Sequence, residues 1–515
     1  MLLIYPPLAK SCEAPAGIAQ LAGTLRGHGL DCTLLDANIE GLLFLLAKQP
    51  PADDTWSRRA WRAVNVNLAR MRSAELYTNP ARYQRAVADL NRIVEQAGLT
   101  RQLSLSLANY QDADVSPLMS ADLLRCAEDP EDNIFFPWFD ERLARILEDT
   151  KPKMVGLSLN YLSQAATTFA MIGFLKRIAP GLAIIVGGGL ITSWLHNPAW
   201  SNPFGGLIDH LVAGPGEAAL LKLSGVEDNG RHHTPDFQDL ACKDYLAPGF
   251  ILPYAASSGC YWNRCSFCPE KAEGNPFHCL PADRVVADLA TLCQKTEPSL
   301  IHFLDNAIAP ALMRRLIESP PGVPWYGFAR VSPLLTDQEF CHRLRRSGCV
   351  MLKLGIESGD QSVLDAMDKG IDLQMVSRTL SALEQAGIAT YVYLLFGTPS
   401  EGLPQARKTL DFVVSHQSAI TFLNLAVFNM PVASPEAHDL QARDFYEGDL
   451  SLYSDFIHPQ GWGRREIRTF LDREFKRHPA ILPILQRDPP LFTSNHAPFF
   501  VSREPSKNNK EEKNE

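Results

Sequence analysis

The chain has 515 residues, which is too long for one ordinary domain and predicts two or three. Its apolar fraction of 46% is ample for packed cores, and its formal net charge of −9 gives no general basic footprint for nucleic acid. The 11 cysteines are scattered at irregular spacing, which argues against a secreted disulfide scaffold. We see no signal peptide and no apolar run long enough for a membrane span, so we expect a reduced, cytoplasmic protein.

Residues 1–225 alternate between strand-like and helix-like segments. The predicted strands are residues 2–5, 32–35, 154–159, 182–186 and 208–213, and helical spacing marks residues 17–26 and 164–178. Such alternation predicts a parallel sheet with ligands at the carboxyl ends of its strands.

Residues 46–149 interrupt this alternation. They are rich in Arg, Ala and Leu, with Trp56, Arg58, Arg59 and Arg62 at loosely helical spacing. We expect an inserted helical segment with a solvated face, because Asp and Glu are interspersed nearby. The alternative is a basic helix that grips RNA or another anionic partner.

Three cysteines lie close together in the stretch Cys260-Tyr-Trp-Asn-Arg-Cys265-Ser-Phe-Cys268. They follow an apolar run and a predicted Ser-Ser-Gly turn, so we place them on a loop that leaves a buried strand. Three thiolates can hold three irons of a [4Fe–4S] cluster and leave the fourth iron open to a ligand. The alternative is a structural zinc site, for which Cys279 or His278 could supply the fourth ligand.

After a predicted linker at 226–249, strand candidates recur regularly. They are residues 250–256, 300–304, 325–329, 350–356, 390–396 and 422–428, with helical segments between them. Six units are too few for a full eight-fold barrel and predict a partial (β/α)6 barrel over 250–430, with functional groups at the strand carboxyl ends. Residues 431–502 depart from the pattern and form a predicted C-terminal cap, and the charged residues 503–515 are predicted to be disordered.

The chain resembles the radical S-adenosylmethionine (SAM) superfamily, in particular its branch with an N-terminal cobalamin-binding domain. The cysteine loop carries most of this resemblance, although four residues separate Cys260 and Cys265 where the family usually has three. Further motifs agree in order: Phe303-Leu304-Asp305-Asn306, Phe328-Ala329-Arg330, Leu354-Gly355-Ile356-Glu357-Ser358-Gly359 and Phe396-Gly397-Thr398-Pro399.

The resemblance implies that Cys260, Cys265 and Cys268 hold a [4Fe–4S] cluster whose open iron binds SAM, and that an electron from the reduced cluster cleaves SAM. It places the carboxylate of SAM near Arg330, and its ribose or amino group near Glu357. The residues expected to contact SAM are Phe267, Asp305, Arg330, Glu357, Ser358 and Gly397.

The N-terminal half resembles a Rossmann-like cobalamin-binding domain. The resemblance rests on Val155-Gly156-Leu157-Ser158, Val186-Gly187-Gly188-Gly189 and Gly214-Pro215-Gly216-Glu217. Glycines at strand ends let the backbone approach a bulky ligand, so Ser158, Gly187, Gly188 and Gly214 are the residues expected at cobalamin. The Asp-x-His-x-x-Gly motif that supplies an axial histidine does not occur.

These patterns indicate an α/β enzyme that cleaves SAM and transfers a methyl group to an unactivated carbon or phosphorus centre with the help of cobalamin. One alternative is a radical SAM rearrangement, cyclisation or other transfer of a SAM fragment without cobalamin. Another is an iron–sulfur or zinc module that binds RNA and has no catalytic activity. The expected partners are a small-molecule or peptide substrate and a reducing electron donor such as flavodoxin or ferredoxin, with no nucleic acid.

Overall fold

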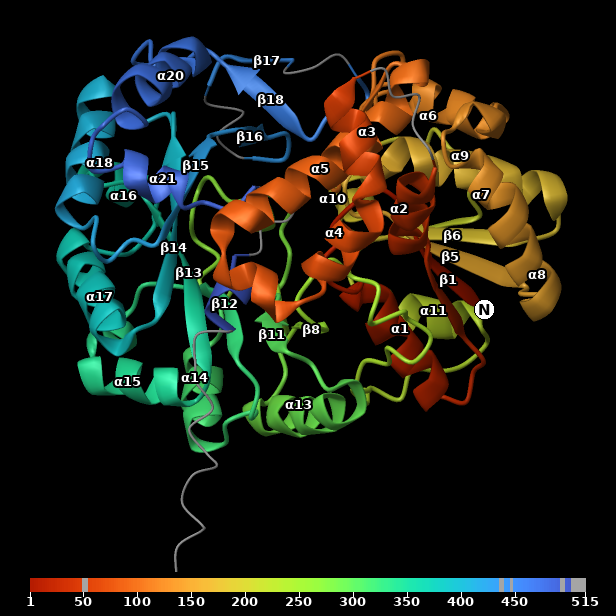
Figure 1. Cartoon of the computed structure of the whole chain (residues 1–515), viewed down its shortest axis with the longest axis horizontal. Helices are drawn as coiled ribbons and strands as arrows, with labels where there is room; N and C mark the ends of the chain where they lie inside the picture. The colour runs from red at the N-terminus through yellow and green to blue at the C-terminus, as the bar shows by residue number, and fades with distance from the viewer. Residues whose placement is uncertain (49–53, 435–439, 445–447, 491–495, 502–515) are drawn as a thin grey trace, which may run out of the picture.

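The computed structural model describes residues 1–48, 54–434, 440–444, 448–490 and 496–501. The predicted disordered tail, residues 503–515, therefore lies outside the described residues. Figure 1 shows two α/β halves side by side, the N-terminal half in red to yellow and the second half in green to blue.

The N-terminal half is built on a five-stranded parallel sheet with the order β2-β1-β5-β6-β7. Its strands are β1 (Leu2–Tyr5), β2 (Thr33–Asp36), β5 (Met154–Ser158), β6 (Ala183–Gly187) and β7 (His210–Val212). Leu2, Leu3 and Ile4 are almost fully buried, as expected for a parallel strand that helices cover on both faces. The strand order reverses between β1 and β5, and such a switch point is where open parallel sheets bind ligands.

Helices cover both faces of this sheet. They are α1 (Ala16–Gly27), α2 (Ala37–Ala47), α9 (Leu162–Ile178), α10 (Gly189–Leu195) and α11 (Glu217–Leu223). In Figure 1, α1 and α11 lie together on one face, and α2 and α9 lie on the other.

The segment between β2 and β5 is mostly helical, as predicted for the insertion. Its elements are α3 (Thr55–Arg62), α4 (Val64–Met71), η1 (Ala74–Thr78), α5 (Pro80–Gly98), η2 (Leu99–Arg101), α6 (Ser120–Glu128), η3 (Pro130–Asp132), α7 (Phe136–Trp138), the π-helix η4 (Phe139–Leu143) and α8 (Ala144–Thr150). A small antiparallel pair, β3 (Leu103–Leu105) and β4 (Tyr110–Asp112), was not expected. Helix α5 starts at Pro80 because the Asn79 side chain caps it, accepting from the Arg82 amide.

The second half contains a six-stranded parallel sheet with the order β15-β14-β13-β12-β11-β8. Its strands are β8 (Ile251–Tyr254), β11 (Leu300–Phe303), β12 (Trp325–Ala329), β13 (Cys349–Glu357), β14 (Ala389–Phe396) and β15 (Phe422–Val427). Because neighbours in the sheet follow one another in the chain, the predicted partial (β/α)6 barrel is confirmed. All six carboxyl ends meet at one edge, the barrel mouth.

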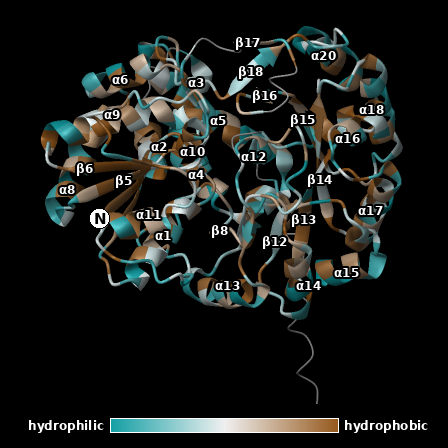
Figure 2. Cartoon of the chain, turned by 180° about the vertical axis from the view of Figure 1, so that it is seen from behind, coloured by the Kyte–Doolittle hydropathy of each residue, from teal (hydrophilic) through white to brown (hydrophobic). Residues whose placement is uncertain are grey.

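Helices separate successive barrel strands and line the outside of the sheet in Figure 1. They are α13 (Ala282–Thr296), α14 (Pro310–Glu318), η5 (Pro333–Thr336), α15 (Gln338–Arg346), α16 (Gln361–Ala366), α17 (Leu373–Ala386) and α18 (Leu403–Ser415). Figure 2 shows hydrophobic colouring concentrated on the strands and hydrophilic colouring on the outer helix faces. No described helix is both long and apolar enough to cross a membrane.

The C-terminal part forms a small antiparallel sheet and short helices. These are β16 (Met430–Pro431), β17 (Ala442–Asp444), β18 (Tyr453–Phe456), α20 (Arg464–Phe470), the π-helix η6 (Leu471–Phe475), α21 (Leu482–Gln486) and α22 (Pro498–Val501). In α22, the Phe499 ring lies 4.9 Å from that of Tyr83 and 5.3 Å from that of Tyr77, so the end of the described chain packs onto the helical insertion. The domain boundaries at 225, 249 and 430 stay predictions.

Candidate active site

The cysteine loop lies at the barrel mouth between β9 (Ser257–Ser258) and α12 (Pro269–Ala272). The predicted Ser-Ser-Gly turn is wrong in its first two residues, because Ser257 and Ser258 pair antiparallel with β10 (His278–Cys279). Gly259 follows with φ +69, and a Cβ there would lie 2.4 Å from the Pro276 carbonyl oxygen. The loop therefore needs glycine at the point where it leaves the strand pair.

The three cysteines of the loop are free thiols. Cys265 is buried, and Cys260 and Cys268 are half-buried. Burial raises the pKa of Cys265, while the nearby Lys369 and Arg330 cations lower it. In the described part of the chain, no group of three or more His, Cys, Asp or Glu side chains is placed so that it could hold one metal ion.

Asp305 ties the start of this loop to the barrel. Its carboxylate is buried, accepts from the Ala256 amide at 3.1 Å and accepts from the Ser257 hydroxyl at 2.5 Å. The side-chain amide of the neighbouring Asn306 donates to the Gly259 carbonyl at 3.1 Å. The Phe303-Leu304-Asp305-Asn306 motif thus contacts the backbone of the cysteine loop, and Asp305 positions this loop.

Arg330, at the end of β12, lies against the cysteine loop. Its guanidinium is 3.8 Å from the centre of the Trp262 ring and donates to the carbonyls of Lys369 and of Gly370, the latter at 3.0 Å. Trp262 is fixed in turn, because its indole N–H donates to the Asp368 carbonyl at 3.1 Å. Burial lowers the pKa of Arg330, yet the group stays a cation at neutral pH because arginine starts so high.

Glu357 forms an ion pair at the end of β13. Its carboxylate lies 2.8 Å from the Lys369 ammonium, and both side chains are largely buried. Glu357 has φ +68, where β13 shifts register against β14. The same ammonium lies 5.5 Å from the centre of the Phe267 ring, so Glu357 and Phe267 share one neighbour beside Cys265.

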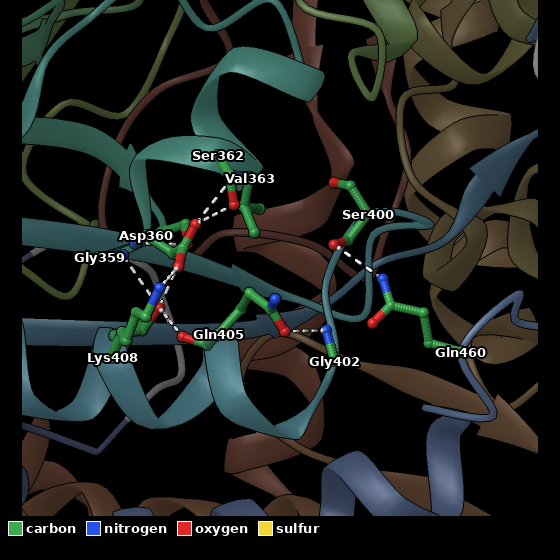
Figure 3. Close-up of polar contacts among 11 residues, drawn as sticks. Gly359, Asp360, Ser362, Val363, Ser400, Gly402, Gln405, Lys408 and Gln460 are labelled. Carbon is green, nitrogen blue, oxygen red and sulfur yellow. Dashed lines mark hydrogen bonds and ion pairs between the residues drawn. The ribbon is translucent and has the colours of Figure 1, made fainter.

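Ser358 lies next to Glu357 but its hydroxyl faces away from the mouth. The side chain is fully buried, lies 3.2 Å from the Thr409 hydroxyl and accepts from the Asp360 amide at 3.1 Å. Figure 3 shows the same turn from the side of Asp360, which accepts from Lys408 of α18 at 2.6 Å. These contacts anchor the turn after β13 to α18.

Gly397 begins the turn after β14. It has φ +87, and a Cβ would lie 2.3 Å from Ile467, so the position requires glycine. Its amide donates to the buried Glu401 carboxylate at 2.5 Å. Burial raises the pKa of Glu401 to about 7, against the effect of its hydrogen bonds from Gly397 and Trp462. Figure 3 also shows Gln460, from the C-terminal part of the chain, in contact with this turn, where it donates to the Ser400 carbonyl at 3.0 Å.

A separate cavity of about 210 Å³ opens at the carboxyl edge of the N-terminal sheet. Its wall contains all four residues predicted there, namely Ser158, Gly187, Gly188 and Gly214. The other lining residues are Leu3, Gly17, Ile18, Gln20, Leu21, Gly156, Leu157, Asn160, Ile185, Val212, Pro215, Gly216, Glu217 and Leu220. The sheet and the facing helices α1 and α11 form this cavity next to the β1–β5 switch point.

Small residues keep this cavity open. A Cβ on Gly17 would meet only the Ser158 hydroxyl, at 3.8 Å, so the empty volume begins at that glycine. The cavity is too small for a corrin ring but matches a flat heterocycle inserted between helix and sheet. The lining residues would therefore fit the nucleotide tail of a cobalamin, and none of them is histidine.

A buried chain of ionisable groups joins the two halves. In the loop after β1, Glu13 accepts from Lys10 at 3.0 Å, and its other oxygen lies 2.8 Å from His302 Nδ1. Lys353 Nζ lies 3.4 Å from His302 Nε2. A neutral His302 that donates through Nδ1 and accepts at Nε2 satisfies both contacts.

The pKa shifts agree with this arrangement. Burial lowers the pKa of His302 to about 4 and that of Lys353 to about 8. Burial raises the pKa of Glu13, but its neighbours His302 and Lys10 lower it further, to below its ordinary range. At neutral pH Glu13 is therefore a carboxylate that lies between Lys10 of its own half and His302 of the barrel.

Solved structures that resemble the chain share both halves. The methyltransferase TsrM from Kitasatospora setae, solved with cobalamin and a [4Fe–4S] cluster, matches with a TM-score of 0.52 at 16% identity, over 85% of this chain and 77% of that one. The cobalamin-dependent enzyme OxsB, solved with aqua-cobalamin, matches with a TM-score of 0.50 at 14% identity, over 83% of this chain and 53% of that one. The fold is that of the cobalamin-dependent radical SAM enzymes.

Curated proteins with similar sequences match a smaller part of this chain than the solved structures do. The bacteriochlorophyllide d C-12(1)-methyltransferase of Chlorobaculum tepidum is 25% identical over 252 residues, which is 46% of this chain and 54% of that protein. The anaerobic magnesium-protoporphyrin IX monomethyl ester cyclase of Rubrivivax gelatinosus is 22% identical over 279 residues, which is 45% of this chain and 49% of that protein. The chain thus spans about half the length of these two relatives, and no protein-family model matches it.

The barrel brings three of the six predicted SAM residues to one place. Phe267, Arg330 and Glu357 surround Cys265 through shared contacts with Lys369 and Trp262. Sequence reasoning did not select Lys369 or Trp262 as site residues. Lys369 and Gly370 follow the Leu354-Gly355-Ile356-Glu357-Ser358-Gly359 motif in the sequence, and Trp262 lies within the lengthened cysteine loop. Both residues could therefore have been selected.

Proposed function

We propose that this protein is a radical SAM enzyme that transfers a methyl group to an unactivated centre with the help of cobalamin. The observation that carries the proposal is the loop of Cys260, Cys265 and Cys268 at the barrel mouth, surrounded by paired cations and carboxylates. Three thiolates suit a [4Fe–4S] cluster with one open iron. When bound, this cluster supplies the electron that breaks a carbon–sulfur bond of SAM.

The chain's own residues hold and orient SAM. Arg330 offers a guanidinium, which binds a carboxylate in two parallel hydrogen bonds. Glu357 accepts from hydroxyl or amino groups, and its partner Lys369 holds the carboxylate in place at 2.8 Å. Phe267 presents an aromatic ring next to Cys268, where it can pack against the adenine. These groups fix the reacting bond next to the cysteine loop and exclude water from it.

The cavity at the N-terminal sheet takes the cobalamin tail in this proposal. Ser158 supplies a hydroxyl and Gly187, Gly188 and Gly214 leave the space for it. When bound, cobalamin carries the methyl group. The C. tepidum relative and TsrM are both methyltransferases, which supports this reaction type.

We also propose a cellular compartment, an electron donor and a substrate class for the enzyme. All 11 cysteines are free, which fits a reducing compartment such as the cytoplasm, where flavodoxin or ferredoxin can supply electrons. The substrate is a small molecule or a peptide, since the net charge of −9 does not favour nucleic acid.

A second candidate is a radical SAM cyclisation. It is favoured by the similarity to the R. gelatinosus cyclase, which extends over 279 residues. The two reactions are distinguished by the fate of the methyl group, because only a methyl transfer consumes it.

Product analysis with methyl-labelled SAM tests the choice. The full chain is reconstituted without oxygen with iron and sulfide, with and without cobalamin, and incubated with a reductant and a cell extract from which proteins have been removed. Methyl transfer predicts label in a small-molecule product only when cobalamin is present. Turnover that leaves all label in methionine, equally with and without cobalamin, rejects methyl transfer in favour of the second candidate.

A further inference from the structure

The helical insertion encloses a second, larger cavity. It has a volume of about 750 Å³ and lies between α3, α4, η1 and α5, which pack side by side in front of the two sheets in Figure 1. Pockets of about 300–1,000 Å³ are the usual size for small-molecule ligands. Its lining residues are Arg59, Ala63, Asn67, Arg70, Ser73, Glu75, Leu76, Ala81, Arg82, Arg85, Ala86 and Asp89, and it shares none of them with the cavity at the N-terminal sheet.

The charge in this cavity is unbalanced. Four arginines and two carboxylates line it. Within the described residues no ion pair involves Arg59, Arg70 or Arg82, and Arg85 only approaches Asp89 at 3.9 Å. Asp89 already accepts from the Trp56 indole at 2.8 Å. The cavity therefore concentrates cations that have no internal partner, in a protein whose net charge is negative.

Outside the cavity, Arg92 of α5 pairs with Asp54 at 3.0 Å and with Glu95 at 2.8 Å. Arg58 and Arg62 do not line the cavity either, and no ion pair involves them among the described residues. The cavity is therefore set apart by the number of exposed arginines that line it, and not by whether each of them is paired.

We propose that this cavity binds a small molecule with at least two anionic groups, either phosphates or carboxylates. Arg59, Arg70 and Arg82 pair with these groups, since a guanidinium matches both in geometry and charge. RNA suits the cavity less well, because no aromatic residue lines it and single-stranded nucleic acid is held largely by base stacking.

Isothermal titration calorimetry on the full chain, with inorganic pyrophosphate and with citrate as probes at fixed ionic strength, tests the site. The cavity variant is R70Q/R82Q, and the matched control is R58Q/R62Q, which removes the same charge from exposed positions that do not line the cavity. We expect saturable binding of pyrophosphate, citrate or both to the wild type and to the control. Binding to the cavity variant should be at least about 100-fold weaker, which is about 10-fold for each lost arginine.

The two probes distinguish the sources of the anion, because phosphate-selective and carboxylate-selective sites each bind one of them. If R70Q/R82Q does not fold, R59Q/R85Q removes two other arginines of the same cavity. Absence of binding to both probes overturns the proposal, and so does equal affinity of cavity and control variants. A 20-nucleotide single-stranded RNA that binds through the same arginines and is not displaced by pyrophosphate overturns it in favour of an RNA site.

Discussion

The barrel mouth and the edge of the N-terminal sheet are the same kind of place, the carboxyl end of a parallel sheet, but they are built from different residues. At the barrel mouth, Arg330 and the Glu357–Lys369 pair surround the cysteine loop. At the N-terminal edge, glycines and aliphatic side chains enclose a cavity of about 210 Å³. In the proposed function, the first site recognises charge and the second recognises shape. Substitutions that remove charge should therefore damage the first site, and substitutions that add volume should damage the second.

The two regions meet at Glu13, and breaking that contact should have the largest effect on stability. Replacing Glu13 by Ala leaves Lys10 and His302 without their buried acceptor. Leaving a buried donor without its acceptor typically costs about 1–3 kcal/mol, and here two donors lose theirs. We expect the urea midpoint of unfolding to fall accordingly in E13A.

The control is Glu141→Ala. Glu141 is exposed and pairs with Arg145 at 3.2 Å, so its loss should cost less than about 1 kcal/mol. If E13A and E141A have the same midpoint, the buried chain does not hold the two halves together.

The shape-recognising site is tested by Gly17→Leu. A side chain at this helical position enters the cavity without a backbone clash, because the nearest atom to a Cβ is 3.8 Å away. Leu also suits a helix better than Gly. Cobalamin affinity, measured by equilibrium dialysis with hydroxocobalamin, should drop about 100-fold or more, which is about 2.7 kcal/mol. G181L, at a position with nothing within 4 Å of a Cβ, should bind like the wild type, and unchanged binding by G17L would place cobalamin elsewhere.

The turn after β14 should make stability depend on pH through Glu401. Burial raises the pKa of Glu401 from 4.5 to about 7, so the folded protein holds a proton that the unfolded chain releases above pH 4.5. Its contribution is full below pH 4.5 and is lost as pH rises through 7, by about 3 kcal/mol in total. Urea unfolding between pH 4.5 and 7.5 should show a smaller decline in E401Q than in the wild type. Parallel curves would mean that Glu401 does not hold the proton.

The smallest effect concerns the charge-recognising site and the ring that packs on Arg330. Trp262→Ala removes a cation–π contact at 3.8 Å, which is worth about 1 kcal/mol when partly desolvated. We expect the Kd for SAM of the reconstituted protein to rise about 5-fold, with the iron content unchanged. Trp262→Phe keeps a ring at this place and should restore most of the affinity. Equal Kd values for W262A and the wild type would show that Arg330 is oriented without it.

The strands of both sheets could be predicted because each is a short apolar run between turn residues. β1 has the predicted bounds, and β13 differs by one residue at each end. Parallel strands buried on both faces are nearly continuous in hydrophobicity, so the pattern alone identifies them. Two-residue strands carry no such pattern. Ser257–Ser258 is a strand only because His278–Cys279 pairs with it after the cysteine loop returns.

The members of the site could be predicted in part, but not their partners. The cysteines and Arg330 stand in recognisable motifs. The carbonyl that Arg330 binds, that of Lys369, is 39 residues away, and the Glu13–His302 contact spans 289 residues. The first contact depends on how the loops after neighbouring barrel strands meet, and the second on how the two halves dock, and no local pattern encodes either. Similarly, Ser358 belongs to a family motif, but only the position of Thr409 on α18 shows that its hydroxyl faces away from the mouth.

Reconstitution of the cysteine loop tests the central claim most directly. Full-length protein purified without oxygen is loaded with iron and sulfide, and its metal content and its consumption of SAM are compared with those of the variant in which Cys260, Cys265 and Cys268 are all alanine. The account predicts about four irons and four sulfides per chain, a broad absorption band in the blue, and reductant-dependent SAM consumption, all lost in the variant. Bound zinc without sulfide, or SAM consumption that survives in the variant, would contradict it.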